Sequence, residues 1–178
     1  MRLDDFAPIA EYYRESDSGF GAFRQHPTVL RLRWPDDVLE QWLYEHSDYG
    51  PFLHDYVNVD LSRIKWNVEV ISTTELIGMP TGLSDGDCID EFAKNPSHWI
   101  SVRQHGVHIG VSLCWEAHGT WKRWPILIDR SLLSSSATGL QVVEGRTRVG
   151  ILKGRCREGS LVAKSHLAWV GRPIGRSE

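Results

Sequence analysis

Residues 140–157 constrain the fold more than any other part of the chain. The first four, LQVV, are mostly apolar and predict a short buried strand. Glu144 and Gly145 interrupt this run, and the twelve residues that follow predict a helix at 146–157. A buried strand that turns directly into a helix predicts a sheet with helices packed against it.

The predicted helix at 146–157 has one apolar face and two glycines. Val149 and Leu152 share the apolar face. Gly150 and Gly154 are poor helix formers, but their lack of a side chain allows a close approach to a neighbouring element. We expect that neighbour to be the sheet.

Other segments supply the remaining strands. Alternating or continuous apolar residues predict strands at 64–71, 107–115, 125–128 and 166–170. The alternation at 107–115 is strict, although a helix remains open at this length. The predicted fold class is therefore α/β (α+β), with a mixed sheet of about five strands and packed helices.

The N-terminal third predicts a helical, acidic extension. Helices are expected at 5–13 and from Pro35 to about residue 46, because Pro and two Asp residues open the second one. Residues 29–34 alternate weakly and predict a strand. The expected organisation is an extension at 1–60 and a second domain at 61–178.

The net charge of −3 hides a strong asymmetry. Residues 121–178 hold eleven Lys or Arg and four acids, a balance of +7, which leaves −10 for residues 1–120. A basic third is expected to attract an anion, most commonly phosphate. The alternative is that the two parts neutralise each other within one fold.

Composition excludes several classes of protein. No apolar run approaches the ~18–20 residues of a membrane span, and the first residues lack the layout of a signal peptide. Three cysteines without a C-x-x-C pair favour a reducing, cytoplasmic setting. Histidines and cysteines are frequent between Cys88 and His118, including His105, but no pair has zinc-ligand spacing, so no metal centre is expected.

The turn after the predicted strand at 140–143 carries the residues with the clearest chemistry. Gly145 lets a ligand approach the backbone, and the amides of a helix start favour an anion. Arg146 and Arg148 can give forked bonds to phosphate, and Thr147 offers a hydroxyl. Glu144 could position a ribose hydroxyl, a metal ion or a water. The alternative is an ordinary surface helix in which Glu144 pairs with Arg148 one turn away.

This segment resembles the nucleotide-binding box of the ParB/sulfiredoxin-like fold. Glu144, Gly145, Arg148 and Gly150 stand where that family has an acid-glycine turn, an arginine and a small helical residue. The resemblance covers roughly residues 61–172. Its members include CTP-hydrolysing DNA-segregation proteins, ATP-dependent sulfinic-acid reductases, a free-serine kinase and nucleases. The resemblance implies anion binding at Gly145, Thr147 and Arg148, with Glu144 as a polar or catalytic partner.

The chain also departs from the family. Sulfiredoxins carry their reactive cysteine where this chain has Arg146, so that chemistry is not expected. The segregation proteins have glutamate at that position and arginine at the position of Thr147, so their CTPase activity is not implied.

Three functional hypotheses follow. The first is a nucleotide- or phosphate-binding protein, either a nuclease or an enzyme of phosphoryl transfer or hydrolysis that uses ATP or CTP with Mg²⁺. There Arg146, Thr147 and Arg148 would hold phosphates and Glu144 would act catalytically. The second is a non-catalytic interaction protein of the antitoxin or immunity type, binding a protein partner through charged faces.

The third hypothesis is direct nucleic-acid binding. Trp121, Lys122 and Arg123 interleave aromatic and basic groups, as a base-stacking surface does. The favoured alternative is that Trp121 and Trp124 anchor the core at the start of a strand. The first two hypotheses make different structural predictions. Arginines that face an open pocket would favour ligand binding, whereas arginines that pair with acids of the same chain would favour the interaction protein.

Overall fold

The computed structural model describes residues 1–102 and 106–175; His105 and the last three residues of the predicted second domain lie outside it. The N-terminal helices are α1 (Ala7–Glu15), α2 (Gly19–Phe23), α3 (Pro27–Leu30), α4 (Asp36–Val38), the π-helix η2 (Leu39–Tyr44) and α5 (Gly50–Tyr56). They are followed by β1 (Ile64–Ser72), α6 (Thr73–Ile77), α7 (Cys88–Ala93), α8 (Pro96–Val102), α9 (Val111–His118), β2 (Ile126–Asp129), β3 (Leu140–Glu144), α10 (Arg146–Glu158) and β4 (Ser165–Pro173). Short 3₁₀ turns lie between them at η1 (Leu3–Asp5), η3 (Leu61–Arg63), η4 (Leu83–Asp85), η5 (Gly106–His108) and η6 (Arg130–Leu132).

Within the described residues, one mixed sheet has the strand order β1-β4-β2-β3. β4 pairs antiparallel with β1 and parallel with β2, and β2 pairs antiparallel with β3. The mixed α+β class is therefore confirmed, with four strands in place of about five. All four lie at predicted positions.

The segment predicted as a fifth strand, 107–115, folds mainly as α9. Gly110 and Gly119 both have left-handed backbone angles and bound this helix. Its packing follows helical spacing, because Val111 is half-buried and Trp115 fully buried four residues later. Leu113, which the strand prediction placed with them, is 66% exposed. A short apolar run carries too little information to separate the two periods.

The weak strand predicted at 29–34 is also wrong. α3 occupies Pro27–Leu30, with Pro27 in its first turn and the His26 ring accepting a bond from the Thr28 amide. Val29 and Leu32 are buried at helical spacing. The predicted helices at 5–13 and 35–46 do form, the second as α4 continued by the π-helix η2.

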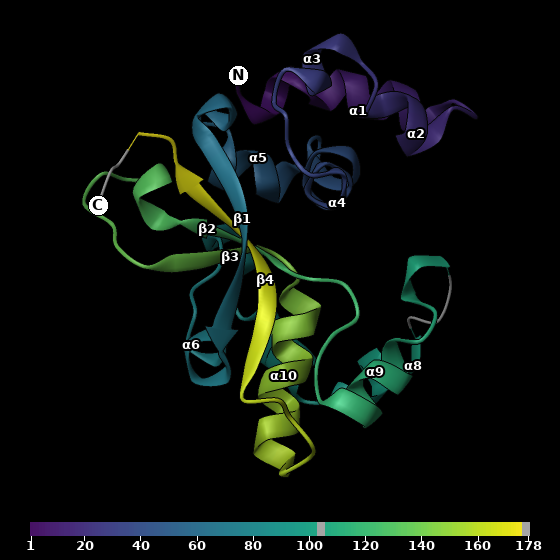
Figure 1. The fold of residues 1–178 in the computed structure, drawn as a ribbon, viewed down its shortest axis with the longest axis vertical. Helices are drawn as coiled ribbons and strands as arrows, with labels where there is room; N and C mark the ends of the chain where they lie inside the picture. The colour runs from purple at the N-terminus through teal and green to yellow at the C-terminus, as the bar shows by residue number, and fades with distance from the viewer. Residues whose placement is uncertain (103–105, 176–178) are drawn as a thin grey trace.

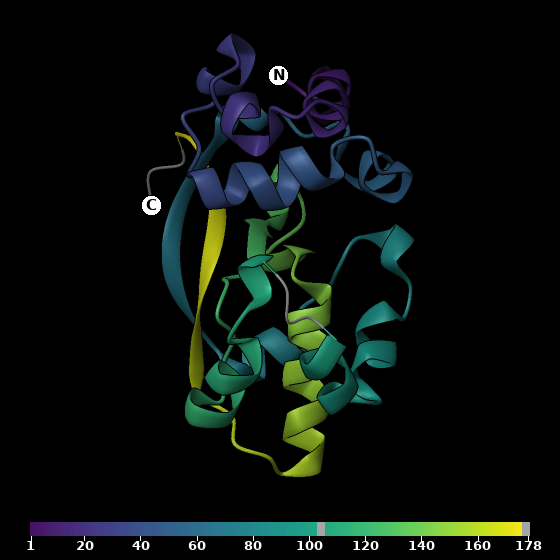
Figure 2. The same cartoon turned by 90° about the vertical axis from the view of Figure 1, so that its right-hand side faces the viewer.

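In Figure 1 the N-terminal helices lie at one end of the sheet and α10 lies alongside β4, whereas Val68 and Val70 of the edge strand β1 remain exposed. Ile126 and Ile128 of β2 belong to one apolar cluster with the N-terminal helices, and Leu127 belongs to a second cluster with α10. β2 is fully buried along these three residues, as expected of a strand with both faces covered. Figure 2 shows η2 crossing one end of the sheet, and α10 running roughly parallel to β4 below it. No helix of the described chain has the length and apolar content needed to cross a bilayer.

α10 makes its close approach to helices and not to the sheet. A Cβ on Gly150 would collide with the Cβ of Phe92 and lie 2.9 Å from the Ile89 carbonyl oxygen. A Cβ on Gly154 would lie 2.5 Å from the Ala93 carbonyl oxygen. The two glycines therefore let α10 pack against α7 and the start of α8. The expectation that they face the sheet is wrong, because Val149 and Leu152 occupy that side.

We expect Gly150→Ala to lower the free energy of unfolding by about 2 kcal/mol, because backbone atoms of α7 cannot move aside cheaply. Urea denaturation measures the change. The matched control is Gly21→Ala in α2, where a Cβ meets nothing within 4 Å and alanine favours the helix. Equal effects of the two substitutions would contradict the close contact with α7.

His166 on β4 connects three segments in the interior. It is 2% exposed, and its Nδ1 and Nε2 lie 2.7 Å and 3.0 Å from the hydroxyls of Thr120 and Thr73. The Thr73 hydroxyl donates its proton to the Ala163 carbonyl, so it accepts from Nε2, and Nδ1 accepts from Thr120. Burial lowers the pKa of His166 to about 4. The ring is therefore neutral in the folded protein at pH 5–7.

This burial predicts a loss of stability on acidification. The unfolded chain binds a proton at His166 below about pH 6.5 and the folded chain only near pH 4, so stability falls as the pH decreases through that window. Between pH 7 and pH 5 the expected loss is about 2 kcal/mol. Urea titrations at both pH values should show a smaller loss for His166→Gln. An unchanged pH dependence in the variant would contradict the assignment.

Candidate functional site

A pocket of about 370 Å³ opens at the N-terminus of α10. We call it the α10 pocket. Its described lining comes from the N-terminal helices, from η4 with α7, and from the strand-to-helix turn: Glu45, His46, Tyr49, Pro51, Ser84, Asp85, Cys88, Phe92, Glu144, Arg146 and Thr147. Segments from three distant parts of the sequence therefore meet at one cavity.

Gly145 sets the position of the α10 start. Its φ of +105° lies in the region that favours glycine, and an added Cβ would lie 2.6 Å from the Cβ of Pro125. The turn therefore packs closely against Pro125, the residue that precedes β2. α10 begins at the next residue and runs for 13 residues, so its unpaired first-turn amides lie at the pocket.

Glu144 and Arg148 form an internal ion pair across one turn. The Arg148 Nη2 donates to Glu144 Oε1 at 3.1 Å, and the Gly145 amide donates to the other carboxylate oxygen. Burial opposes ionisation of Glu144, but Arg148, His46 and the Gly145 amide outweigh it and hold the pKa of that carboxyl below its usual range. Glu144 is therefore an anion at neutral pH. Glu144 lines the α10 pocket, whereas Arg148 lines a separate small cavity of about 30 Å³ on the other side of Thr147.

Arg146 is the basic side chain that lines the pocket. Its guanidinium donates to Asp85 at the end of η4 and lies over the Phe52 ring, 4.8 Å from the centroid. Burial lowers the pKa of Arg146, but the bond to Asp85 more than compensates and leaves the pKa raised, so the guanidinium stays charged. Thr147 lines the cavity beside it.

The N-terminal helices contribute two ionisable residues that sequence analysis did not single out. Glu45 and His46 follow η2 directly and line the pocket. Burial raises the pKa of Glu45, against the attraction of Arg123, and lowers the pKa of His46. Nothing local in the sequence connects them with residues a hundred positions later, so only folding brings them beside Glu144.

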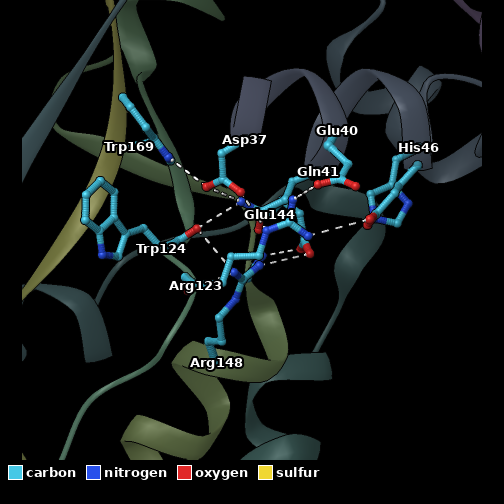
Figure 3. Close-up of polar contacts among 11 residues, drawn as sticks. Asp37, Glu40, Gln41, His46, Arg123, Trp124, Glu144, Arg148 and Trp169 are labelled. Atoms are coloured by element: carbon cyan, nitrogen blue, oxygen red, sulfur yellow. Dashed lines mark hydrogen bonds and ion pairs between the residues drawn. The ribbon is translucent and has the colours of Figure 1, made fainter. Parts of the chain in front are cut away.

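A polar network behind the pocket connects the N-terminal helices to α10 (Figure 3). Arg123 donates to Asp37 at 2.6 Å and to Glu40 at 2.5 Å, and its Nη1 lies 3.8 Å from Glu45. From the other side, Arg148 donates to the carbonyl oxygens of Arg123 and Trp124 at 3.0 and 3.2 Å. Asp37 also accepts bonds from Gln41 and from the Trp169 indole.

Trp121, Lys122 and Arg123 all line one small cavity of about 30 Å³, but they differ in burial and in their hydrogen-bond partners. Trp121 is 4% exposed, and its indole donates to the Leu167 carbonyl oxygen at 2.8 Å, so this ring packs in the core. Lys122 is exposed and donates to the Ile109 carbonyl oxygen at 2.6 Å. Arg123 faces the acids of η2. This arrangement fits the core-anchor interpretation of Trp121.

Residues 1–102 and 106–175 contain no group of three or more His, Cys, Asp or Glu side chains placed to hold a metal ion. A cation at the α10 pocket would therefore need ligands from a bound molecule as well as from the protein. Comparisons of the chain with protein-family models, curated proteins and solved structures found no match.

The arrangement defines what the pocket can do chemically. Arg146 and the amides of the first turn of α10 can attract an anion, and Glu45, His46 and Glu144 can accept hydrogen bonds or handle a proton. Phe92 and Tyr49 supply apolar surface for a flat group.

We expect Arg123→Met to lower the free energy of unfolding by about 2 kcal/mol, because it leaves the carboxylates of Asp37 and Glu40 without their cation. Chemical denaturation followed by tryptophan fluorescence measures the change. Lys122→Met removes the same charge from the exposed neighbouring side chain and should cost less than about 0.5 kcal/mol. Similar values for both would show that the network around Arg123 contributes little.

Proposed function

We propose that the chain binds a nucleotide or another phosphate-bearing ligand in the α10 pocket. The observation that carries this proposal is the coincidence of a 370 Å³ cavity, the N-terminus of a 13-residue helix and the guanidinium of Arg146. Helix N-terminal amides and arginine side chains both bind phosphate groups well. ATP or CTP with Mg²⁺ are the ligands to test first.

The resemblance of residues 144–150 to the ParB/sulfiredoxin-like box supports the same proposal. The residues of this segment have two different proposed roles. Arg146 and Thr147 line the cavity and are proposed as phosphate ligands. Arg148 binds Glu144 and two carbonyl oxygens, so its proposed role is to hold the turn in shape.

An enzymatic role in phosphoryl transfer or hydrolysis would need a group that handles a proton. Glu144 is ionised and its two oxygens accept bonds from Gly145 and Arg148, which leaves it suited to orienting a polar ligand group. His46 lines the same cavity and burial lowers its pKa, so the ring is neutral at pH 7 and able to accept a proton. A nuclease activity would place the same groups around a phosphodiester.

A thermal-shift panel tests the proposal, with ATP, CTP, GTP and ADP, each with and without Mg²⁺. A ligand at about 100 times its dissociation constant stabilises the folded state by about 2.7 kcal/mol, which raises the melting temperature measurably. We expect at least one nucleotide to produce this rise and Arg146→Gln to abolish it. The matched control is Arg157→Gln near the other end of α10, where the side chain is half exposed and pairs with Asp90.

A second candidate function is the non-catalytic interaction protein. The observation that favours it is internal charge pairing, since Arg123 and Arg148 both pair with carboxylates of the same chain. A flat nucleotide panel with a well-folded protein would reject ligand binding at the α10 pocket. It would leave a protein partner that binds the charged faces as the better hypothesis.

A further inference from the structure

The lining of the α10 pocket has an unusual charge for an anion site. Of its charged side chains in the described residues, Glu45, Asp85 and Glu144 are acidic and Arg146 is basic. Glu144 already has Arg148, and Glu45 lies near Arg123. Asp85 differs from these two, because its partner is Arg146, the group to which a phosphate would bind.

The contact between Asp85 and Arg146 is shielded from water. The Asp85 side chain is 6% exposed and that of Arg146 is 16% exposed. Coulombic attraction at such a site is screened less than on the surface, so the carboxylate is an effective competitor for the guanidinium. An arriving phosphate must displace Asp85 or bind beside it with like charges in contact.

The segment that carries Asp85 is fixed on one side and open on the other. Ser84 donates from its amide to Asp55 of α5 at 3.1 Å and from its hydroxyl at 2.5 Å, and a Cβ on Gly82 would collide with the same carboxylate. After Asp85, Gly86 has a φ of +52° and no atom within 4 Å of its added Cβ. The Asp85 side chain is therefore held at Arg146 by an anchored turn.

We propose that Asp85 is an internal competitor that determines how strongly the α10 pocket binds anions. This inference rests on the proposed function, because it concerns the same phosphate site. In the ligand-free protein Asp85 occupies the guanidinium of Arg146. Ligand binding exchanges the carboxylate for a phosphate group and releases Asp85 from Arg146. The residue therefore favours ligands that supply enough other contacts to offset its loss, and it weakens the binding of small free anions.

Isothermal titration of the full chain with sodium pyrophosphate in EDTA tests the inference. Asp85→Asn keeps the size of the side chain and removes its charge, and we expect it to bind pyrophosphate at least tenfold more tightly than the wild type. The control is Asp87→Asn, which makes the same charge change two residues later at an exposed position outside the pocket lining. Its affinity should stay within twofold of the wild type.

A measurement on the wild type complements the titration in case Asp85→Asn folds poorly. Pyrophosphate at saturating concentration should speed amide hydrogen exchange in residues 83–87, because that segment loses its contact with Arg146. Slower or unchanged exchange in residues 83–87 would overturn the proposed role of Asp85, and so would equal pyrophosphate affinities of the wild type and Asp85→Asn. Neither result would contradict phosphate binding in the α10 pocket. Failure of every variant to bind any phosphate or nucleotide would overturn the proposed function together with this inference.

Discussion

Two arginine side chains hold residues 123 and 124 between the N-terminal helices and α10, and the shape of the α10 pocket depends on this clamp. Arg123 binds acids of α4 and η2, whereas Arg148 binds the carbonyl oxygens of residues 123 and 124 from the side of α10. The pocket takes its walls from both of these sides. Because the two guanidinium groups bind one short segment, the walls keep a fixed separation.

Ion pairs between distant parts of the chain neutralise much of the charge asymmetry of the sequence. In the described residues, four arginines of the basic third bind acids of residues 1–120: Arg123 binds Asp37 and Glu40, Arg146 binds Asp85, Arg157 binds Asp90, and Arg172 binds Glu69. The Arg123 and Arg146 side chains are only 14% and 16% exposed, so their ion pairs lose much of their solvation and require partners with good geometry. The acidic and basic parts of the sequence are therefore complementary within one fold, and of these arginines Arg146 is the one that lines the α10 pocket.

The local patterns predicted the sheet better than they predicted the helices around it. β1, β2, β3 and β4 lie where alternating or continuous apolar residues predicted strands, because each strand buries part of its apolar residues in one of the two core clusters. The errors at 29–34 and 107–115 have one cause. In both, a few apolar residues fit either period, and packing against other elements decided the outcome, as the exposed Leu113 shows.

The sequence by itself determined the strand, the glycine turn and the start of α10, since each follows from neighbouring residues. It also identified Glu144, Gly145 and Arg146 as candidate ligand-binding groups. Only the tertiary structure brought Glu45, His46 and Asp85 to the same cavity and separated Arg146 from Arg148 in role. The physical reason is distance along the chain, because contacts between residues 60 to 100 positions apart depend on how whole elements pack and leave no local pattern.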